Sequence, residues 1–147
     1  MIEAPFPASV LLDTCALIWL ANGESLSDRA LAAIRNAGRG GGVLVSTTSA
    51  LEIGMLARPK ATSRPMPQFL PDPKAWFAKL MGMQGMRETP ITVAIAIDAS
   101  FLPGEFHPDP MDRLIVATAR CLGVPIVTRD RKILEYAEGG YVQAIAC

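Results

Sequence analysis

Residues 10–14 read Val10-Leu11-Leu12-Asp13-Thr14, a short apolar run that stops at an aspartate. Such an uninterrupted apolar run predicts a strand that is buried on both faces, as the strands of a parallel sheet are. An apolar helical stretch from Cys15 to Leu20 follows at once, and Asn22-Gly23 ends it. The chain therefore opens with a strand, an acidic residue at the carboxyl end of that strand, and a helix.

The same alternation of strand and helix continues along the chain. Further strands are expected at about residues 43–45, 86–91, 125–128 and 141–145, and helices at about 28–37, 49–57, 73–83, 110–122 and 131–137. Residues 93–101 are ambiguous, because Val93, Ile95 and Ile97 alternate as in a strand while the alanines between them favour a helix. This order of elements predicts a three-layer α/β/α sandwich with a mainly parallel central sheet.

Length and composition limit the class of protein. A chain of 147 residues suits one domain, so we expect residues 1–147 to form a single unit, with an N-terminal extension at 1–9 and a Pro-rich surface loop at 58–73. The longest uninterrupted apolar run, residues 15–21, is far shorter than the ~20 residues that a membrane span requires. The N-terminus also lacks the basic start and cleavage site of a signal peptide. We therefore expect a cytoplasmic protein that does not enter a membrane.

The cysteines and the charges add two exclusions. Three widely spaced cysteines indicate neither a disulfide framework nor a zinc site, and reduced thiols in the core are expected. The 14 basic residues equal the 14 acidic residues in number, so any polyanion must be bound locally. The basic residues that crowd the last third of the chain form either a solvated face or a phosphate-contacting rim: Arg113, Arg120, Arg129, Arg131 and Lys132.

Four carboxylates stand where distant segments are expected to meet. Asp13 and Asp130 follow strands, Glu52 lies one turn into the helix after the second strand, and Asp112 lies in the first turn of its helix. Ligands of parallel sheets sit beyond the carboxyl ends of the strands. No lysine or arginine adjoins Asp13 or Glu52, so their charge is costly unless a cation compensates it. The set predicts a hard cation with oxygen ligands, Mg²⁺ or Mn²⁺.

Three of these acids also have a purely structural interpretation, whereas Asp13 is the hardest to explain in that way because its neighbours on both sides should be buried. Asp112 can stabilise the helix dipole, Asp130 can cap a helix or pair with its arginine neighbours, and Glu52 can be an exposed helix residue. Asp109 is expected only to cap the following helix. The single histidine, His107, lies in a Pro-rich segment without a serine or cysteine nucleophile motif, which argues against triad hydrolysis.

Four motifs, taken in order, resemble those of PIN-domain ribonucleases, and more narrowly those of the VapC toxins of bacterial type II toxin–antitoxin systems. The motifs are Val10-Leu11-Leu12-Asp13-Thr14, Ser49-Ala50-Leu51-Glu52-Ile53, Asp109-Pro110-Met111-Asp112-Arg113-Leu114-Ile115 and Val127-Thr128-Arg129-Asp130. The resemblance extends from about Val10 to the C-terminus. It implies a PIN-like sandwich and a metal-dependent endoribonuclease, in which water activated by Mg²⁺ or Mn²⁺ hydrolyses RNA phosphodiesters.

The resemblance also assigns expected roles to particular residues. Asp13, Glu52 and Asp112 match the three core acids of the family, and Asp130 matches the fourth. The supporting residues are Thr14 and Thr128, at hydroxyl positions that can hold a metal-bound water, and Arg113, which contacts phosphate or anchors the acid. The resemblance further implies a cognate antitoxin whose chain lies over the acidic cleft, and a homodimer.

Two other functions remain open from the sequence. A phosphoacceptor receiver domain has a similar size and sheet, but it needs paired acids at the first strand, and Asp13 has no acidic neighbour. A receiver domain also needs a lysine after a late strand, and Lys132 stands in a different context. A degenerate PIN scaffold that only binds RNA or protein is the second alternative, and the intact acids at all four positions argue against it.

Overall fold

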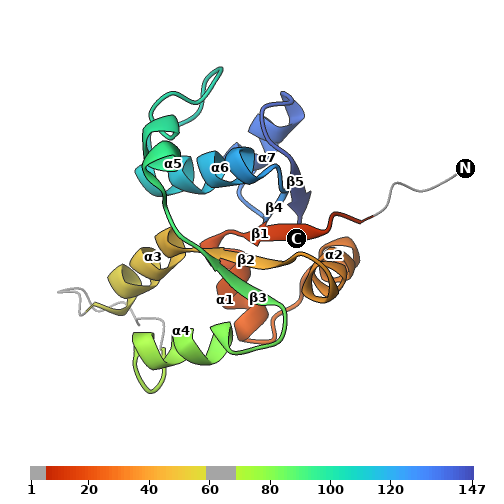
Figure 1. Ribbon diagram of the computed structural model, residues 1–147, viewed down its shortest axis with the longest axis vertical. Coiled ribbons are helices and arrows are strands. Elements are labelled where there is room, and N and C mark those ends of the chain that lie inside the picture. The colour runs from red at the N-terminus through yellow and green to blue at the C-terminus, as the bar shows by residue number, and fades with distance from the viewer. Residues whose placement is uncertain (1–5, 59–68) are drawn as a thin grey trace, which may run out of the picture.

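The computed structural model describes residues 6–58 and 69–147, and these residues form a five-stranded parallel sheet in the order β3-β2-β1-β4-β5 (Figure 1). The strands are β1 (Ser9–Leu12), β2 (Gly42–Ser46), β3 (Met86–Thr89), β4 (Ile126–Thr128) and β5 (Ala144–Ala146). Strand β1 lies in the middle, between β2 and β4. The carboxyl ends of these three strands therefore lie side by side at one edge of the sheet.

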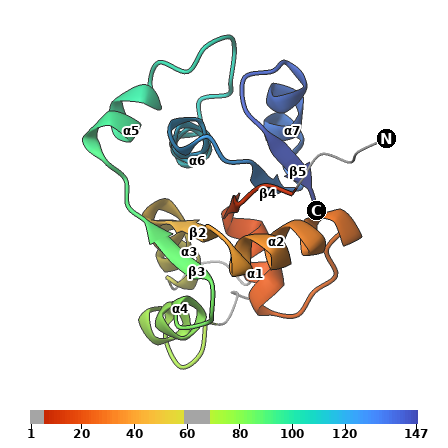
Figure 2. The same ribbon diagram turned by 45° about the vertical axis from the view of Figure 1, so that its right-hand side comes forward.

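Helices cover both faces of the sheet. They are α1 (Thr14–Ala21), α2 (Asp28–Arg39), α3 (Thr47–Ala57), α4 (Pro73–Met81), α5 (Val93–Asp98), α6 (Pro110–Leu122) and α7 (Arg131–Glu138). Helices α1 to α4 pack against one face, and α5 to α7 pack against the other (Figure 2). The expected three-layer α/β/α sandwich is confirmed.

The central strand explains why the opening motif is apolar throughout. Val10 and Leu12 are fully buried in the core under α1 to α4, whereas Leu11 is fully buried in the core under α5 to α7. Side chains alternate between the two faces of a strand, so a strand covered on both faces needs an apolar residue at every position. Each buried leucine stabilises the fold by about 1.5 to 3 kcal/mol. Asp13, directly after β1, is thereby fixed at the centre of the sheet edge.

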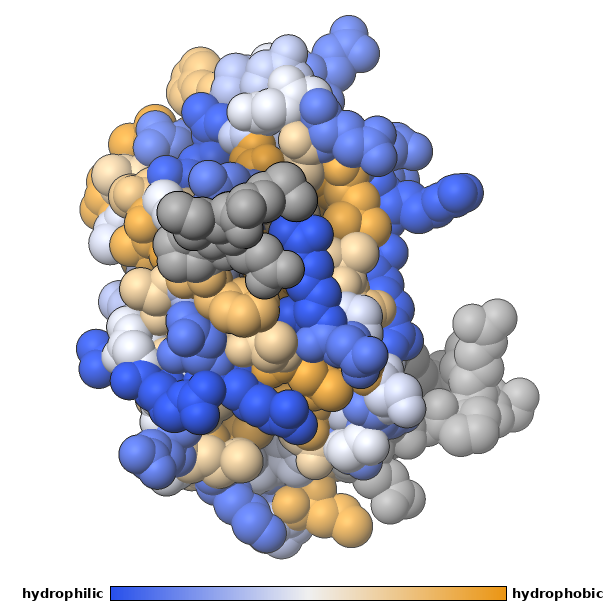
Figure 3. Space-filling model, turned by 90° about the vertical axis from the view of Figure 1, so that its right-hand side faces the viewer, coloured by the Kyte–Doolittle hydropathy of each residue, from blue (hydrophilic) through white to orange (hydrophobic). Residues whose placement is uncertain are grey.

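Polar caps set where the helices begin. Ser27 and Asp109 cap α2 and α6 as expected, with Ser27 Oγ accepting from Ala30 N at 3.1 Å. Helix α3 begins earlier than expected, because Ser46 rather than Thr48 or Ser49 is its cap. Figure 3 shows one face of the molecule, on which hydrophilic side chains surround separate hydrophobic patches.

The ambiguous segment at 93–101 begins as helix α5, because Thr92 Oγ1 accepts from Ile95 N at 3.1 Å and caps it. Strand β3 ends at Thr89, since Pro90 has no N–H to continue the ladder. The last strand starts at Ala144 instead of residue 141, because residues 139–142 make a turn.

Three further expectations need correction or lie partly outside the description. The prediction of core thiols was wrong, since Cys15 and Cys121 are exposed and Cys147 is half-buried. Strand β1 takes Ser9 from the expected extension 1–9, and Phe69, at the end of the expected surface loop 58–73, is buried. Residues 1–5 and 59–68 lie outside the described residues. Among the helices that are described, none is long and apolar enough to cross a membrane.

Candidate active site

Asp13 is the carboxylate at the centre of the sheet edge. Its Oδ1 accepts from Ala16 N at 2.8 Å and so caps α1, while its Oδ2 accepts from the hydroxyl of Thr128, the last residue of β4. Only 9% of the residue is exposed. Burial raises the pKa of Asp13, and the two hydrogen bonds oppose that effect. The side chain is therefore fixed, and its negative charge is poorly compensated.

Glu52 reaches the same edge from α3. Its Oε1 accepts from Thr14 Oγ1 at 2.6 Å, and Thr14 Oγ1 also lies 3.0 Å from Ser49 Oγ. Because the single Thr14 proton goes to Glu52, Ser49 is the donor in the second bond. Burial raises the pKa of Glu52, and the Thr14 hydrogen bond lowers it. The polar chain Ser49–Thr14–Glu52 joins α1 to α3 at the site.

Asp112 lies in the first turn of α6. Burial, followed by the charges of Asp109 and Asp130, raises the pKa of Asp112 to about 6. His107 Nε2 lies 3.0 Å from Asp112 Oδ2, at ion-pairing distance but without the alignment of a hydrogen bond. Asp109 caps the helix by accepting from Met111 N at 2.9 Å and from Asp112 N at 3.4 Å.

Asp130 completes the set at the start of α7. Its Oδ1 accepts from Lys132 N at 2.8 Å and from Ile133 N at 3.2 Å, so the structural interpretation of this acid as a helix cap is confirmed. Its own N–H donates to Thr128 Oγ1 at 2.9 Å. The buried Thr128 hydroxyl therefore bridges the Asp13 side chain and the Asp130 backbone.

The structure brings all four predicted acids to one pocket. The pocket has a volume of about 250 Å³ and is lined by Asp13, Thr14, Cys15, Trp19, Glu52, Asp112, Ile115, Arg129 and Asp130. Among the residues that the structure describes, however, no three histidine, cysteine, aspartate or glutamate side chains are grouped so that they could hold a metal ion as they stand. Each carboxylate is instead engaged by a neighbour.

Arg113 does not reach this pocket. Its Nε donates to Ala99 O at 2.7 Å, and its Nη1 lies 2.9 Å from Phe106 O and 3.3 Å from His107 O. The guanidinium therefore holds the segment between α5 and α6 in place. Of the two expected roles, contact with phosphate has no support in this geometry, whereas anchoring the surroundings of Asp112 does.

The sequence reasoning did not assign to the site four residues that line the pocket: Cys15, Trp19, Ile115 and Arg129. Cys15 and Trp19 are four residues apart on α1, so they share the helix face that follows Asp13. That spacing could have predicted that Cys15 and Trp19 lie on the same side of the helix near Asp13. Arg129 was noted only within the basic group of the last third of the chain.

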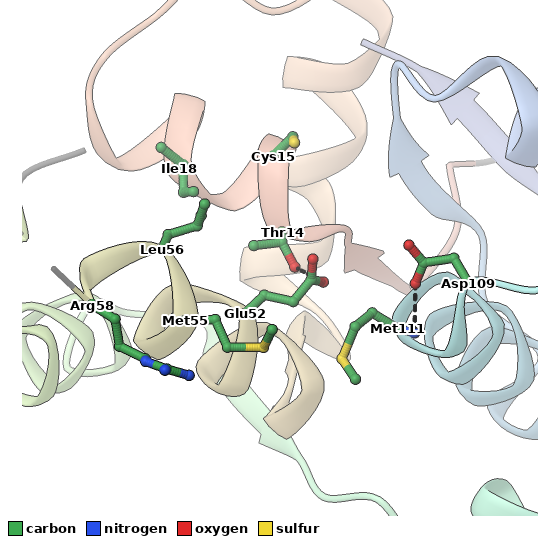
Figure 4. A pocket seen from close by; sticks show the side chains of 9 residues that line it. All are labelled: Thr14, Cys15, Ile18, Glu52, Met55, Leu56, Arg58, Asp109 and Met111. Atoms are coloured by element: carbon green, nitrogen blue, oxygen red, sulfur yellow. Dashed lines mark hydrogen bonds between the residues drawn. The ribbon is translucent and has the colours of Figure 1, made fainter. Parts of the chain in front are cut away.

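A second and larger pocket adjoins the first. It has a volume of about 580 Å³, shares Thr14, Cys15 and Glu52 with the acidic pocket, and is otherwise mainly apolar (Figure 4). Ile18 and Leu56 face each other across it, and Met55 and Met111 flank Glu52. The acidic pocket thus continues into an apolar groove between α1 and α3.

The chemistry of the donor set fits a hard divalent cation. All four acids offer carboxylate oxygens, which Mg²⁺ and Mn²⁺ prefer. The raised pKa values of Asp13, Glu52 and Asp112 show that each charge is costly as it stands. A cation in the pocket would remove that cost.

The match to a known protein family covers the residues that form the site. The sequence profile of the PIN domain matches residues 10–139, which include all four acids. The chain belongs to the PIN-domain family. A relative in Mycobacterium tuberculosis, Ribonuclease VapC22, is 34% identical over 126 residues, which are 85% of this chain and 89% of the relative. Membership of this family removes the receiver-domain alternative.

Solved structures share the PIN fold. VapBC2 from Rickettsia felis, bound to a DNA fragment from its promoter, matches with a TM-score of 0.64 at 10% identity, over 94% of this chain and 98% of that one. VapBC-5 from Mycobacterium tuberculosis, a member of the VapBC family of toxin–antitoxin systems, matches with a TM-score of 0.59 at 21% identity, over 96% and 100%. At these identities the likeness supports the fold alone.

Proposed function

We propose that this PIN domain is an endoribonuclease, the toxin of a VapC-type toxin–antitoxin pair, and that it hydrolyses RNA phosphodiesters with the help of a divalent metal ion. The observation that carries the proposal is the convergence of Asp13, Glu52, Asp112 and Asp130 on one pocket. The 34% identity to Ribonuclease VapC22 supports the same activity.

Asp13, Glu52, Asp112 and Asp130 would hold Mg²⁺ or Mn²⁺. When bound, such an ion lowers the pKa of water and offsets the charge of the phosphate that is cut. Mg²⁺ is usually held by one or two carboxylates together with waters and substrate phosphates. One or two of the four acids would therefore be enough to hold the ion directly.

Hydrogen bonds from neighbouring residues fix two of these acids in position. Thr128 and the N-terminus of α1 fix both oxygens of Asp13, and Thr14 fixes Glu52. These hydrogen bonds also favour the charged carboxylates, which are the forms that bind a cation. No protein nucleophile is required, so we expect attack by water, and the resemblance to VapC toxins implies 5′-phosphate and 3′-hydroxyl products.

The proposal includes partners. We infer a cognate antitoxin whose chain lies over the acidic pocket, for which the adjoining apolar groove at Ile18, Met55 and Leu56 offers a contact surface. We also infer a homodimer, a single PIN-like domain over residues 1–147, and a location in the cytoplasm, where the exposed thiols of Cys15 and Cys121 would stay reduced.

Cleavage of RNA by charge-neutral variants tests the proposal. We expect Asp13→Asn and Asp112→Asn to lose cleavage by at least ~100-fold while the circular dichroism spectrum is unchanged, since removing one electrostatic group of a catalytic site commonly costs that much. Asp98→Asn is the matched control, because Asp98 is an exposed acid at the end of α5. Chelation by EDTA should abolish wild-type cleavage, and added Mn²⁺ should restore it.

These experiments distinguish an endoribonuclease from a degenerate PIN scaffold that only binds RNA or protein. Cleavage by both Asn variants at the wild-type rate would refute the assignment of the acids. A wild-type protein that binds RNA without cutting it in Mg²⁺ or Mn²⁺ would establish the degenerate scaffold instead.

A further inference from the structure

Arg129 is held on three sides at the edge of the acidic pocket. Its guanidinium carbon lies 4.1 Å from the centre of the Trp19 ring, its Nε donates to Cys147 O at 2.6 Å, and its Nη2 donates to Ser25 O. An arginine stacked on an aromatic face with two in-plane hydrogen bonds has lost most of its rotational freedom. The side chain is thus positioned before any ligand arrives.

The charge of Arg129 is not paired within the acidic pocket. Among the residues that the structure describes, it is the only basic residue that lines the acidic pocket, and it forms no ion pair with any carboxylate there. The hydrogen bonds to Ser25 and Cys147 use only some of the five N–H groups of the guanidinium. An arginine surrounded by acids would ordinarily pair with one of them. Here Trp19, Ser25 and Cys147 hold it instead.

An anionic strand that enters this pocket meets four carboxylates. The repulsion between a phosphodiester backbone and these acids opposes binding, and a divalent ion offsets it only where the ion sits. A pre-positioned guanidinium at the pocket edge offers a second site for a phosphate group, with charge-assisted hydrogen bonds from its remaining N–H groups.

We propose that Arg129, held against Trp19, binds a backbone phosphate of the RNA strand whose neighbouring linkage is cut in the acidic pocket. Arg129 is in this account a substrate-binding residue, and Trp19 is a positioning residue that acts through it. The inference rests on the proposed function, because it takes RNA as the ligand.

Binding of RNA at several salt concentrations tests this inference. The probe is a fluorescein-labelled single-stranded RNA of random sequence, and the protein carries Asp112→Asn and is measured in magnesium buffer so that the RNA stays intact. We expect a further Arg129→Gln change to weaken binding about tenfold, as loss of one charge-assisted hydrogen-bonding group does. The slope of log affinity against log salt should fall by about 0.7, the value for one phosphate contact in a single strand.

Arg131→Gln is the matched control. Arg131 carries the same charge two residues further on, is exposed, and does not line the pocket, so its loss should leave the slope unchanged. A residue that only ties Ser25 and Cys147 together would change the melting temperature and not the slope. Equal slopes for the Arg129→Gln and Arg131→Gln proteins would therefore overturn the inference.

Variants of Trp19 test the positioning role and remain informative if Arg129→Gln fails to fold. Trp19→Phe keeps an aromatic face under the guanidinium and should bind RNA nearly as the parent does, whereas Trp19→Leu should bind several-fold more weakly. Equal binding by these two variants would overturn the role of Trp19. If the parent protein itself binds no RNA, the proposed function fails, which is a different result from RNA binding that is indifferent to Arg129.

Discussion

Thr128 is a single buried hydroxyl on which two parts of the site depend. It donates to Asp13 Oδ2 and accepts from Asp130 N at 2.9 Å, and none of its surface is exposed. A buried carboxylate without a donor is strongly disfavoured as the charged form. The hydroxyl therefore lowers the pKa of Asp13 and favours its charged form.

We expect Thr128→Val to lower cleavage about tenfold or more and to destabilise the protein by about 1 to 3 kcal/mol, because it leaves the buried carboxylate of Asp13 without its donor. Thr128→Ser retains the hydroxyl and serves as the control. Cleavage assays and urea unfolding measure the two effects. Equal activity in the valine and serine variants would contradict this role.

Asp112 makes stability depend on pH in the metal-free protein. Its pKa rises from 3.8 to about 6 on folding, so the folded state binds the proton more tightly, and stability is lost as pH rises through this interval. With 27% of the side chain exposed, solvent screening reduces the effect. We expect Asp112→Asn to stabilise the metal-free protein by about 1 to 2 kcal/mol at pH 7 and to make little difference at about pH 4.

Urea unfolding in EDTA at these two pH values checks this expectation. The same substitution should abolish cleavage, so the change in stability and the change in activity have opposite signs. If the asparagine variant were less stable at pH 7, the Asp112 charge would instead be stabilising the fold, through its contact with His107.

At the scale of single residues, the sequence predicted the positions of the carboxylate side chains better than those of the arginine side chains. Asp13 and Asp130 could be placed because they directly follow apolar runs, and strand ends meet at one edge of a parallel sheet. Arg113 and Arg129 each adjoin an acid in sequence, yet only Arg129 lines the pocket. A guanidinium reaches several ångströms from its backbone, so its partners depend on loops that the sequence pattern does not place.

Among the elements, helix α6 controls the position of Asp112. Asp109 caps this helix, and its charge is also one cause of the raised pKa of Asp112. Removing the cap therefore affects both the helix and the acid one turn inside it.

We expect Asp109→Ala to cost about 0.5 to 2 kcal/mol of stability and to reduce cleavage, because the first turn of α6 frays where Asp112 lies. Asp72→Ala is the matched control, since Asp72 caps α4 in the same way, away from the acidic pocket. That variant should lose a similar amount of stability and keep its activity. Thermal melting and a cleavage assay distinguish the two, and equal activity of both variants would contradict a role for the start of α6.

Element boundaries show where pattern reasoning fails. The segment from Val93 to Ile97 alternates as a strand does, but its apolar side chains at both ends are exposed, and the Thr92 cap makes it a helix. The start of α3 was misplaced because Ser46, Thr48 and Ser49 are all possible caps and only backbone geometry distinguishes them. For a strongly apolar element such as β1, the sequence pattern fitted only a buried strand.

For the whole molecule, the most exposed apolar side chains of α5 and of the residues just after it form one feature of the surface. Val93, Ile97 and Phe101 are 77%, 55% and 79% exposed and lie four residues apart in and just beyond the helix. Large apolar side chains grouped on a surface commonly mark an interface between proteins. We assign this surface to the inferred homodimer.

We expect the wild-type protein to be dimeric and the Ile97→Glu/Phe101→Glu double variant to be monomeric at the same concentration, as measured by light scattering. Leu122→Glu, which places the same charge on an exposed leucine of α6, should remain dimeric. A dimeric double variant would place the interface elsewhere.

The strand order has a consequence for synthesis of the chain. Strands β1, β2 and β3 come first and fill one half of the sheet, while Asp112, Arg129 and Asp130 are contributed by the last third of the chain. A ribosome must therefore translate this chain through residue 130 before all four acids of the pocket are present. Until then Asp13 and Glu52 lack the other two acids, so we expect a chain truncated before α6 to form three strands of the sheet and to have no nuclease activity.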